Sequence, residues 1–575
     1  MQTPSRNVWT GRAVADWPTW DLPGPFVAYA DGDYDSEWGP SPKTRAELRM
    51  YQLSWALRSK PEWQRKTADP EIRAKWRKEA LEQQQSVEPG NKMTEKMIDY
   101  VLAELDGYAK IADNEKGIER GCYDAIWYSD RLISDEVTQR LKSAASALEN
   151  VPEEEKDWHP GSNGQVLDLV HPSLYCIVYG RTHAHLPDKP RTQDNFLPVV
   201  FSTLRDDIKK WMCSEAFCWL PSDFAVDENG SVTLLSPYIN NLHPARHQPL
   251  YRIIEDVLTG FIPVFEHVLG DIDRESDGGG SFDRTDRLGK VSCIWGEGGK
   301  PWPEDEPKTD EDEDEFYDKF YASVQKVYPD ANPYTGALDA NFSPVSLRGR
   351  TIQCIVKLAN IHLTPESPEY AGGSWHVEGM VNESIVASGI YYYDEENITE
   401  STLSFRVATG QPGYHGQDDS TCMKILYGIS RDDICVQDIG AMVTKAGRAL
   451  SWPNLFQHRV SSFKLADPSK PGHRKILALF LVDPTIDPIA SATDVPPQQA
   501  EWAAEAFEEA SVTPESAMAQ LPRELVDLVK KQFSSTVMTR KEAEAYRLEL
   551  MKERTAFVQA HTDTAYGLTF NMCEH

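Results

Sequence analysis

The sequence predicts a mixed α+β protein with one strand-rich region between two helical ones. Three observations support this class. Apolar residues recur at helical spacing from Thr44 to about Ser146, short apolar runs separated by turn residues dominate positions 351 to 483, and helical spacing returns after Val495. The chain has 575 residues, more than one core usually carries, so we expect several structural regions.

The N-terminal helices have recognisable first residues. Thr44 and Thr94 each precede an apolar pattern with three-and-four spacing, Pro70 suits the first turn of a helix, and Ser134 is typical of a cap. This part of the sequence contains no chemical motif. We therefore expect residues 1–155 to form a mainly helical region that packs against the rest.

The middle of the chain changes character twice. Residues 156–270 contain short apolar runs, a hairpin signal at positions 227 to 230 and an amphipathic helix near Leu250 to Leu269. Residues 271–345 include a segment rich in Gly, Asp and Ser and a run dominated by acidic residues. These compositions predict exposed insertions.

Positions 346–492 have the strongest strand signals. Apolar runs start at Thr351, Ile385 and Leu403, and Ile476 opens a run that is typical of a fully buried strand. Residues 493–575 then form a helical C-terminal region, with a long charged helix from Arg540. The sequence therefore predicts five regions: 1–155, 156–270, 271–345, 346–492 and 493–575.

Composition excludes several classes of function. The formal net charge of −31 argues against nucleic acid as a partner, because Lys and Arg supply most of the attraction to phosphate. No apolar stretch is long enough to span a membrane, and the first residues do not resemble a secretory signal. The nine cysteines are scattered without a metal-binding pair, which favours a reducing compartment, and we expect a cytoplasmic protein.

Three residues form the most informative constellation. His376 and Glu378 are separated by one residue, so in a strand both side chains would lie on one face, and His458 follows on a distant strand. Two imidazoles and one carboxylate can hold an iron ion and leave coordination positions open. Arg474 precedes the buried run at Ile476, where it could bind a dicarboxylate.

This arrangement resembles the iron(II) and 2-oxoglutarate dependent oxygenases, which carry such a motif on a double-stranded β-helix, also called a jelly roll and similar to cupins. The resemblance implies that His376, Glu378 and His458 bind Fe(II) and that Arg474 pairs with 2-oxoglutarate. It also implies a cosubstrate contact from Asn360 on the preceding strand, and it makes Arg406 a second candidate anchor. Two departures are Glu378 in place of the commoner Asp and Ile476 in place of a Ser or Thr.

Longer motifs resemble a mainly fungal family known only as a domain of unknown function, DUF4246. They stand at positions 157–162, 171–174, 179–182, 238–244, 373–379 and 452–458. The resemblance covers most of the chain. It implies an oxygenase-like fold and names no substrate.

The expected function is therefore an oxidoreductase, a 2-oxoglutarate dependent dioxygenase with Fe(II), 2-oxoglutarate and O2. Its expected substrate is a small metabolite, with a free amino acid as the first candidate. Hydroxylation, desaturation and ring closure stay open as outcomes. Two alternatives remain: a zinc-binding cupin-like hydrolase or isomerase, and a non-catalytic interaction protein that keeps the fold.

Overall fold

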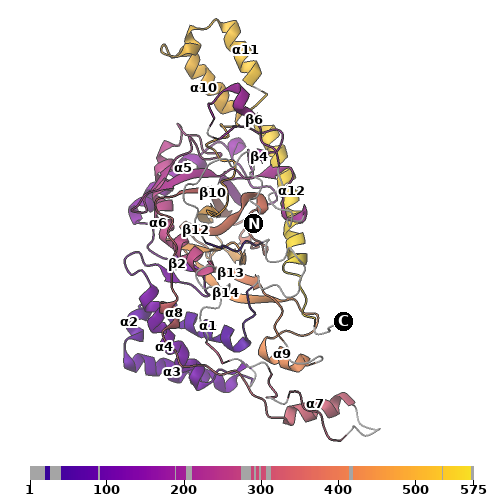
Figure 1. Cartoon of the computed structure of the whole chain (residues 1–575). Helices are drawn as coiled ribbons and strands as arrows, with labels where there is room; N and C mark the ends of the chain where they lie inside the picture. Colours follow the sequence, from indigo (N-terminus) through magenta and orange to yellow (C-terminus); the bar gives the residue numbers. More distant parts are fainter. Residues whose placement is uncertain are drawn as a thin grey trace.

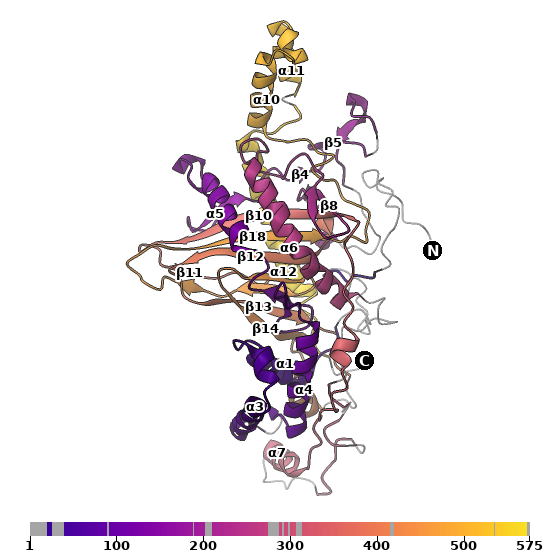
Figure 2. The ribbon, with the colours of Figure 1, turned by 90° about the vertical axis from the view of Figure 1, so that its left-hand side faces the viewer.

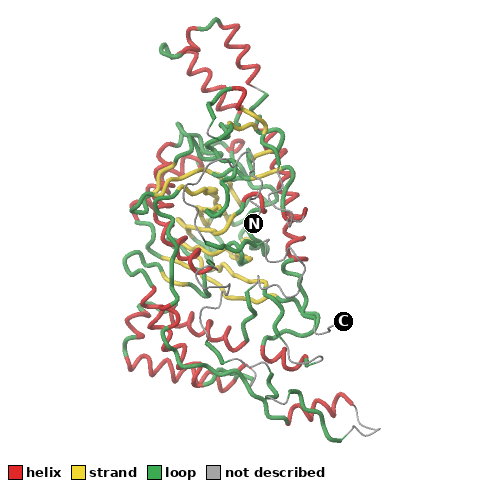
Figure 3. Tube along the Cα trace, in the orientation of Figure 1, coloured by secondary structure: helices red, strands yellow, loops and turns green. Residues whose placement is uncertain are grey.

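A strand-rich centre surrounded by helices forms the body of the computed structural model (Figures 1 and 3). The structure describes residues 20–25, 40–88, 91–187, 189–201, 210–273, 287–289, 293–296, 299–305, 313–413, 419–533 and 535–571. The helices α10 and α11 extend away from the body at one end, and α7 lies near the other end (Figure 2). The coarse prediction of a mixed protein with antiparallel sheets is confirmed.

The predicted helix starts are confirmed. The side chains of Thr44, Thr94 and Ser134 accept hydrogen bonds from backbone N–H groups of the first turn, and Pro70 begins its helix after an Asp69 cap. No helix of the described residues is long and apolar enough to cross a membrane. The helices are α1 Arg45–Arg58, α2 Trp63–Thr67, α3 Pro70–Gln83, α4 Glu95–Ile111, α5 Asp135–Glu149, α6 Gln248–Ile272, α7 Glu313–Ser323, α8 Ala337–Ala340, α9 Ser420–Leu426, α10 Ala500–Val512, α11 Arg523–Phe533 and α12 Arg540–Thr564.

The larger sheet has nine strands, and every pairing within it is antiparallel. Its centre is formed by the long strands that the sequence predicts. In spatial order the strands are β1 Glu119–Arg120, β2 Trp127–Ser129, β15 Ala449–Pro453, β12 Ile385–Glu396, β18 Gly472–Val482, β10 Thr351–Leu363, β8 Ser222–Val226 and β9 Val232–Leu234, with β3 Val166–Val170 also paired to β10.

A smaller sheet contains β14 Val436–Thr444, β13 Ser401–Ala408 and β16 Gln457–Val460, in that order. Short pairs lie outside both sheets: β11 Glu369–Tyr370 with β17 Phe463–Lys464, β4 Ile177–Val178 with β7 Phe217–Cys218, and β5 His183–His185 with β6 Phe196–Pro198. Along the chain, β10, β12, β15 and β18 belong to the larger sheet, whereas β13, β14 and β16 belong to the smaller one.

The two faces of the larger sheet have different neighbours. Arg474 on β18 donates to Ser401 of the smaller sheet, whereas the next residue, Lys475, donates to Glu149 of α5. On β12, a Cβ added to Gly389 would lie 2.8 Å from Phe261 of α6, so glycine allows this helix to approach closely. We call the side of Arg474 the inner face and the side covered by α5 and α6 the outer face.

Two expectations about the chain's regions need correction. The segment 271–345 is not simply an exposed insertion, because Arg287 is 1% exposed and pairs with Glu104, and Asp271 is buried beside Trp127. Acidic composition alone does not reveal such long-range partners. The predicted helical region 1–155 also contributes β1 and β2 to the larger sheet. The five-region division itself stays a prediction.

Two histidines, His561 which is buried and His267 which is half-buried, predict a loss of stability in acid. Burial lowers the pKa of His267 to about 4 and that of His561 to about 4. The folded state therefore binds fewer protons than the unfolded state between about pH 6.5 and pH 4, so stability falls as the pH falls through that window. We expect each histidine to contribute a loss of roughly 3 kcal/mol by pH 4.

Urea unfolding at pH 7 and pH 4.5 measures this loss. The variant His267→Gln cannot titrate at this position and is expected to lose less stability between the two pH values than the wild type. An equal pH dependence in the two proteins would contradict the assignment to His267.

Candidate metal centre

Backbone hydrogen bonds bring two of the three predicted ligands, His376 and His458, together. His376 follows β11, and His458 lies on β16; each donates its backbone N–H to the carbonyl of the other, over 3.3 Å and 3.0 Å. His376 forms only this isolated bridge. The expectation that His376 and Glu378 lie on a regular strand is therefore wrong, because the chain turns at Gly379, which has a φ of 69°.

The three side chains nevertheless converge. Oε1 of Glu378 lies 3.7 Å from Nε2 of His376 and 3.4 Å from Nε2 of His458. One ligand atom from each residue lies within 4.8 Å of the others, so a single metal ion could contact all three. His376 also places Nδ1 2.8 Å from the carbonyl of Ser374, which leaves Nε2 free to bind a metal.

Electrostatics favour an ionised carboxylate at this centre. Burial raises the pKa of Glu378, but hydrogen bonds from both histidines outweigh it and leave this pKa well below the usual range. Burial lowers the pKa of His376, but the hydrogen bond and charge of Glu378 outweigh it and raise this pKa overall. Burial and the neighbouring His376 lower the pKa of His458. Negative charge is therefore held where a cation would bind.

Asn454 fixes the backbone of the carboxylate ligand. Its Oδ1 accepts from the N–H of Glu378 at 2.8 Å, and its Nδ2 donates to the carbonyl of Glu378 at 2.8 Å and to that of Ile385 at 3.0 Å. The side chain is fully buried. Asn454 thus acts as a positioning residue for Glu378.

Replacing Asn454 with alanine is expected to weaken metal binding about 10- to 100-fold, the usual effect of removing a group that orients a ligand. Titration of the metal-free protein with Fe(II) without oxygen measures it. Asn360→Ala is the matched control, because it also removes a fully buried amide with two hydrogen bonds. An equal loss of affinity in both variants would contradict a positioning role for Asn454.

The structure does not bring Asn360 to the triad. Its Nδ2 donates to Glu149 of α5, and its Oδ1 accepts from Tyr393, so the side chain lies on the outer face of the larger sheet. The predicted contact between Asn360 and a cosubstrate is therefore corrected. Asn360 stands at a suitable distance before His376 in the sequence. However, side chains alternate between the two faces of β10, and this alternation directs Asn360 toward the helices on the outer face.

The two predicted arginines lie on different sheets, Arg474 on β18 of the larger sheet and Arg406 on β13 of the smaller one. Arg474 lies on the inner face and is 1% exposed, and its guanidinium donates to Glu395 at 2.8 Å and 3.0 Å and to Ser401 at 2.6 Å. Arg406 donates to Gln457 and stacks over Trp375. Because Arg406 pairs in register with Gln457 and the neighbouring Phe405 pairs with His458, Arg406 faces away from the triad.

Sequence reasoning missed Lys357. It lies on β10 opposite Ala478 of β18, two positions before Ala359 and four before Ile361, which pairs with Arg474. Alternation therefore places Lys357 on the inner face, where its charge lowers the pKa of His376. Within the described residues no hydrogen bond or ion pair holds this ammonium group. The signal that could have identified Lys357 is its position as a single charged residue within the apolar run of β10.

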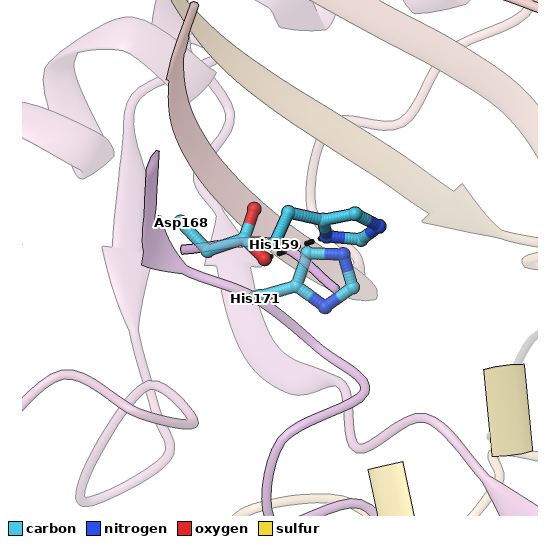
Figure 4. A group of neighbouring side chains, drawn as sticks. All are labelled: His159, Asp168 and His171. Atoms are coloured by element: carbon cyan, nitrogen blue, oxygen red, sulfur yellow. Dashed lines mark hydrogen bonds and ion pairs between the residues drawn. The ribbon is translucent and has the colours of Figure 1, made fainter. Parts of the chain in front are cut away.

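A second group of possible ligands also escaped sequence reasoning. His159, Asp168 and His171 lie together beside β3 (Figure 4), and one ligand atom from each lies within 4.8 Å of the others. Burial lowers the pKa of His171 to about 3. His159 and His171 stand in two of the family motifs, 157–162 and 171–174, which had suggested no chemistry, and Asp168 lies between these motifs.

The two antiparallel sheets and the triad define a candidate metalloprotein of mixed α/β fold. The chain belongs to the family described as "Protein of unknown function (DUF4246)", whose model matches residues 95–506. The description "Domain of unknown function DUF4246, N-terminal" matches residues 24–79. No match was found among curated proteins.

Three solved structures have parts that are similar to parts of this chain. The Fe(II)/(alpha)ketoglutarate-dependent dioxygenase TqaL has a TM-score of 0.23 and 8% identity, covering 61% of this chain and 75% of that one. EvdO2 from Micromonospora carbonacea var. aurantiaca, complexed with 2-oxoglutarate, has a TM-score of 0.12 and 15% identity, covering 22% and 52%. Oxalate decarboxylase from Lactobacillus farciminis has a TM-score of 0.11 and 10% identity, covering 38% and 58%. These weak likenesses leave the activity open.

Proposed function

We propose that this protein is an Fe(II) and 2-oxoglutarate dependent oxygenase. The observation that carries the proposal is the convergence of His376, Glu378 and His458 from two chain segments, with Glu378 within 3.7 Å of both imidazoles. A set of two histidines and one carboxylate suits iron that must keep positions open for small molecules. The residues present therefore fit the metal that the proposal requires.

Strand order supports a double-stranded β-helix as the finer description of the core. Such a fold alternates its strands between two sheets. Here β10, β12, β15 and β18 lie in the larger sheet, and β13, β14, β16 and the bridge at His376 lie on the other side. This order would place the ligands at the end of the space between the sheets.

Each residue of the centre has a distinct task in the proposed reaction. His376, Glu378 and His458 would hold iron(II), and Asn454 would keep the Glu378 backbone in place. When bound, iron(II) would supply the chemistry that lets O2 react: 2-oxoglutarate would give two electrons to O2 and leave as succinate and CO2, with one oxygen atom in succinate and the other available to oxidise a C–H bond of the substrate. Hydroxylation, desaturation and ring closure are all compatible with this chemistry.

Two cations on the inner face can receive the far carboxylate of 2-oxoglutarate. Arg474 is the cation that the sequence predicts, but Glu395 already neutralises it. Lys357 forms no ion pair within the described residues, and its charge acts on Asp168 and His171 as well as on His376. The proposal therefore gives the main contact to Lys357 and keeps Arg474, with Ser401, as the second cation.

The proposed substrate is a small metabolite, with a free amino acid first. The side chains of His376, Glu378 and His458 are 33%, 16% and 6% exposed, which favours a small molecule over a folded protein as the group that reaches them. None of the described cysteines forms a disulfide, which supports a reducing compartment such as the cytoplasm.

One observation favours a different reaction. Because Arg474 is bound to Glu395, a zinc-dependent hydrolase or isomerase without 2-oxoglutarate would explain that arginine as a structural ion pair. A non-catalytic interaction protein would give no reason for two histidines and a carboxylate to converge within reach of one metal ion.

Succinate formation tests the proposal. Purified protein with Fe(II), 2-oxoglutarate, ascorbate and O2 is expected to produce succinate, with faster production when a library of amino acids is added. Zinc in place of iron should give none. Iron-loaded protein that yields no succinate with any candidate substrate, but hydrolyses one with zinc, would support the rival reaction.

A further inference from the structure

We propose that His159, Asp168 and His171 form a second divalent-cation site, of the kind that binds zinc. This inference does not depend on the activity proposed for the first centre. The ligands come from other residues, and they lie along β3, at the edge of β10, rather than at the bridge between His376 and His458.

The chain builds this site as a small two-stranded arrangement. Trp158 forms a bridge with Leu167, the N–H of His159 donates to Val166 at 2.8 Å, and the N–H of Asp168 donates to Asp157 at 2.9 Å. Residues 159 and 168 are therefore diagonal neighbours on one face of the pair. Their side chains meet with Nδ1 of His159 2.7 Å from Oδ2 of Asp168 (Figure 4).

The carboxylate of Asp168 points to a missing cation. Its side chain is 1% exposed, and its Oδ1 has no hydrogen-bond partner among the described residues. A buried carboxylate is costly unless it is paired with a cation or fully hydrogen-bonded. No Lys or Arg of the described residues forms a salt bridge with it; the imidazole of His159 lies at ion-pair distance, and the charges of His171 and Lys357 also lower its pKa. A divalent ion would supply the missing charge.

The two imidazoles complete a ligand set. His171 is 6% exposed, and its ring centre lies 5.1 Å from that of His159. Nδ1 of His171 accepts from the N–H of Ser173 at 3.2 Å, so metal binding would replace this long hydrogen bond. His159 is the more exposed member, at 26%, and gives access from solvent. Two His and one Asp with an open position are a usual set for zinc.

The rival explanation is a metal-free hydrogen-bonded group. In that case Asp168 would only orient His159, and the unpartnered oxygen would stay unpartnered. The two explanations differ in metal content and in the response of stability to zinc, neither of which requires knowledge of the substrate.

Zinc titration of the full chain tests the proposal. After treatment with chelator, the double variant His376→Ala/His458→Ala is expected to bind one equivalent of Zn(II) by calorimetry, and its thermal midpoint should rise. Adding Asp168→Asn, which keeps the shape of the side chain, should reduce the stoichiometry to zero and abolish the rise. His247→Gln, a histidine elsewhere in the chain, is the matched control and should leave both results unchanged.

Two results would overturn the inference. A double variant that binds no zinc would show that the first centre alone takes metal. A stoichiometry of one that persists after Asp168→Asn, with the fold intact by circular dichroism in chelator, would place the ion elsewhere. Because the double variant lacks the first centre, failure of the proposed oxygenase activity would not produce either result.

Discussion

Replacement of His458 with alanine is expected to remove iron binding at the first centre and to lower succinate formation more than about 100-fold, beyond the usual effect of losing a group that only orients a ligand. The physical reason is the geometry: Nε2 of His458 lies 3.4 Å from Oε1 of Glu378, so both atoms can bind one ion. Anaerobic Fe(II) titration and a succinate assay measure the two losses.

A control variant separates loss of a ligand from loss of a half-buried histidine that has a hydrogen-bond partner. His473→Gln removes an imidazole whose Nε2 lies 2.9 Å from the carboxylate of Asp394. Both residues lie on the larger sheet, away from the triad. It is expected to keep iron binding and turnover near the wild-type level. Full iron binding by His458→Ala would rule out the triad as the metal centre.

Replacement of Lys357 with methionine is expected to raise the KM for 2-oxoglutarate about 10- to 100-fold, the effect of removing one charged hydrogen bond. Methionine keeps the apolar stem of this inner-face residue without the ammonium. Lys357→Arg should restore most of the affinity. Iron binding should change little, because Lys357 is not a ligand. Succinate formation at varied 2-oxoglutarate concentrations measures the KM.

Arg474 is the competing anchor for 2-oxoglutarate, and a test of its role requires a variant that leaves no buried charge unpaired. Arg474→Gln with Glu395→Gln removes both members of the pair, whereas either change alone would strand a charge. We expect the double variant to change the KM less than Lys357→Met does. A larger change of this KM in the double variant than in Lys357→Met would show that Arg474 makes the main contact with 2-oxoglutarate, as the sequence predicts.

Local signals in the sequence identified the helices and strands well, and they identified three residues whose side chains converge. Helix starts at Thr44, Thr94 and Ser134 were predictable because a cap depends on residues within one turn. The triad was recognisable because few residue types bind metals. The strand around His376 was not, because its single bridge to His458 depends on a partner far along the chain.

Side-chain direction and distant partners were the parts that sequence could not give. Asn360 has a suitable position in the chain but lies on the outer face, one step of alternation away from the inner one. Arg287 stands in a segment of exposed character, yet it is buried against Glu104. Asp168 acquires its histidine neighbours only through the pairing of its strand.

The central claim is that one iron centre binds 2-oxoglutarate directly. Its most direct test is the absorption spectrum of the protein with Fe(II) under anaerobic conditions, before and after addition of 2-oxoglutarate. We expect a visible band that appears only with both components and is lost in His376→Ala. A wild-type protein that binds Fe(II) at the triad but develops no band with saturating 2-oxoglutarate would contradict it.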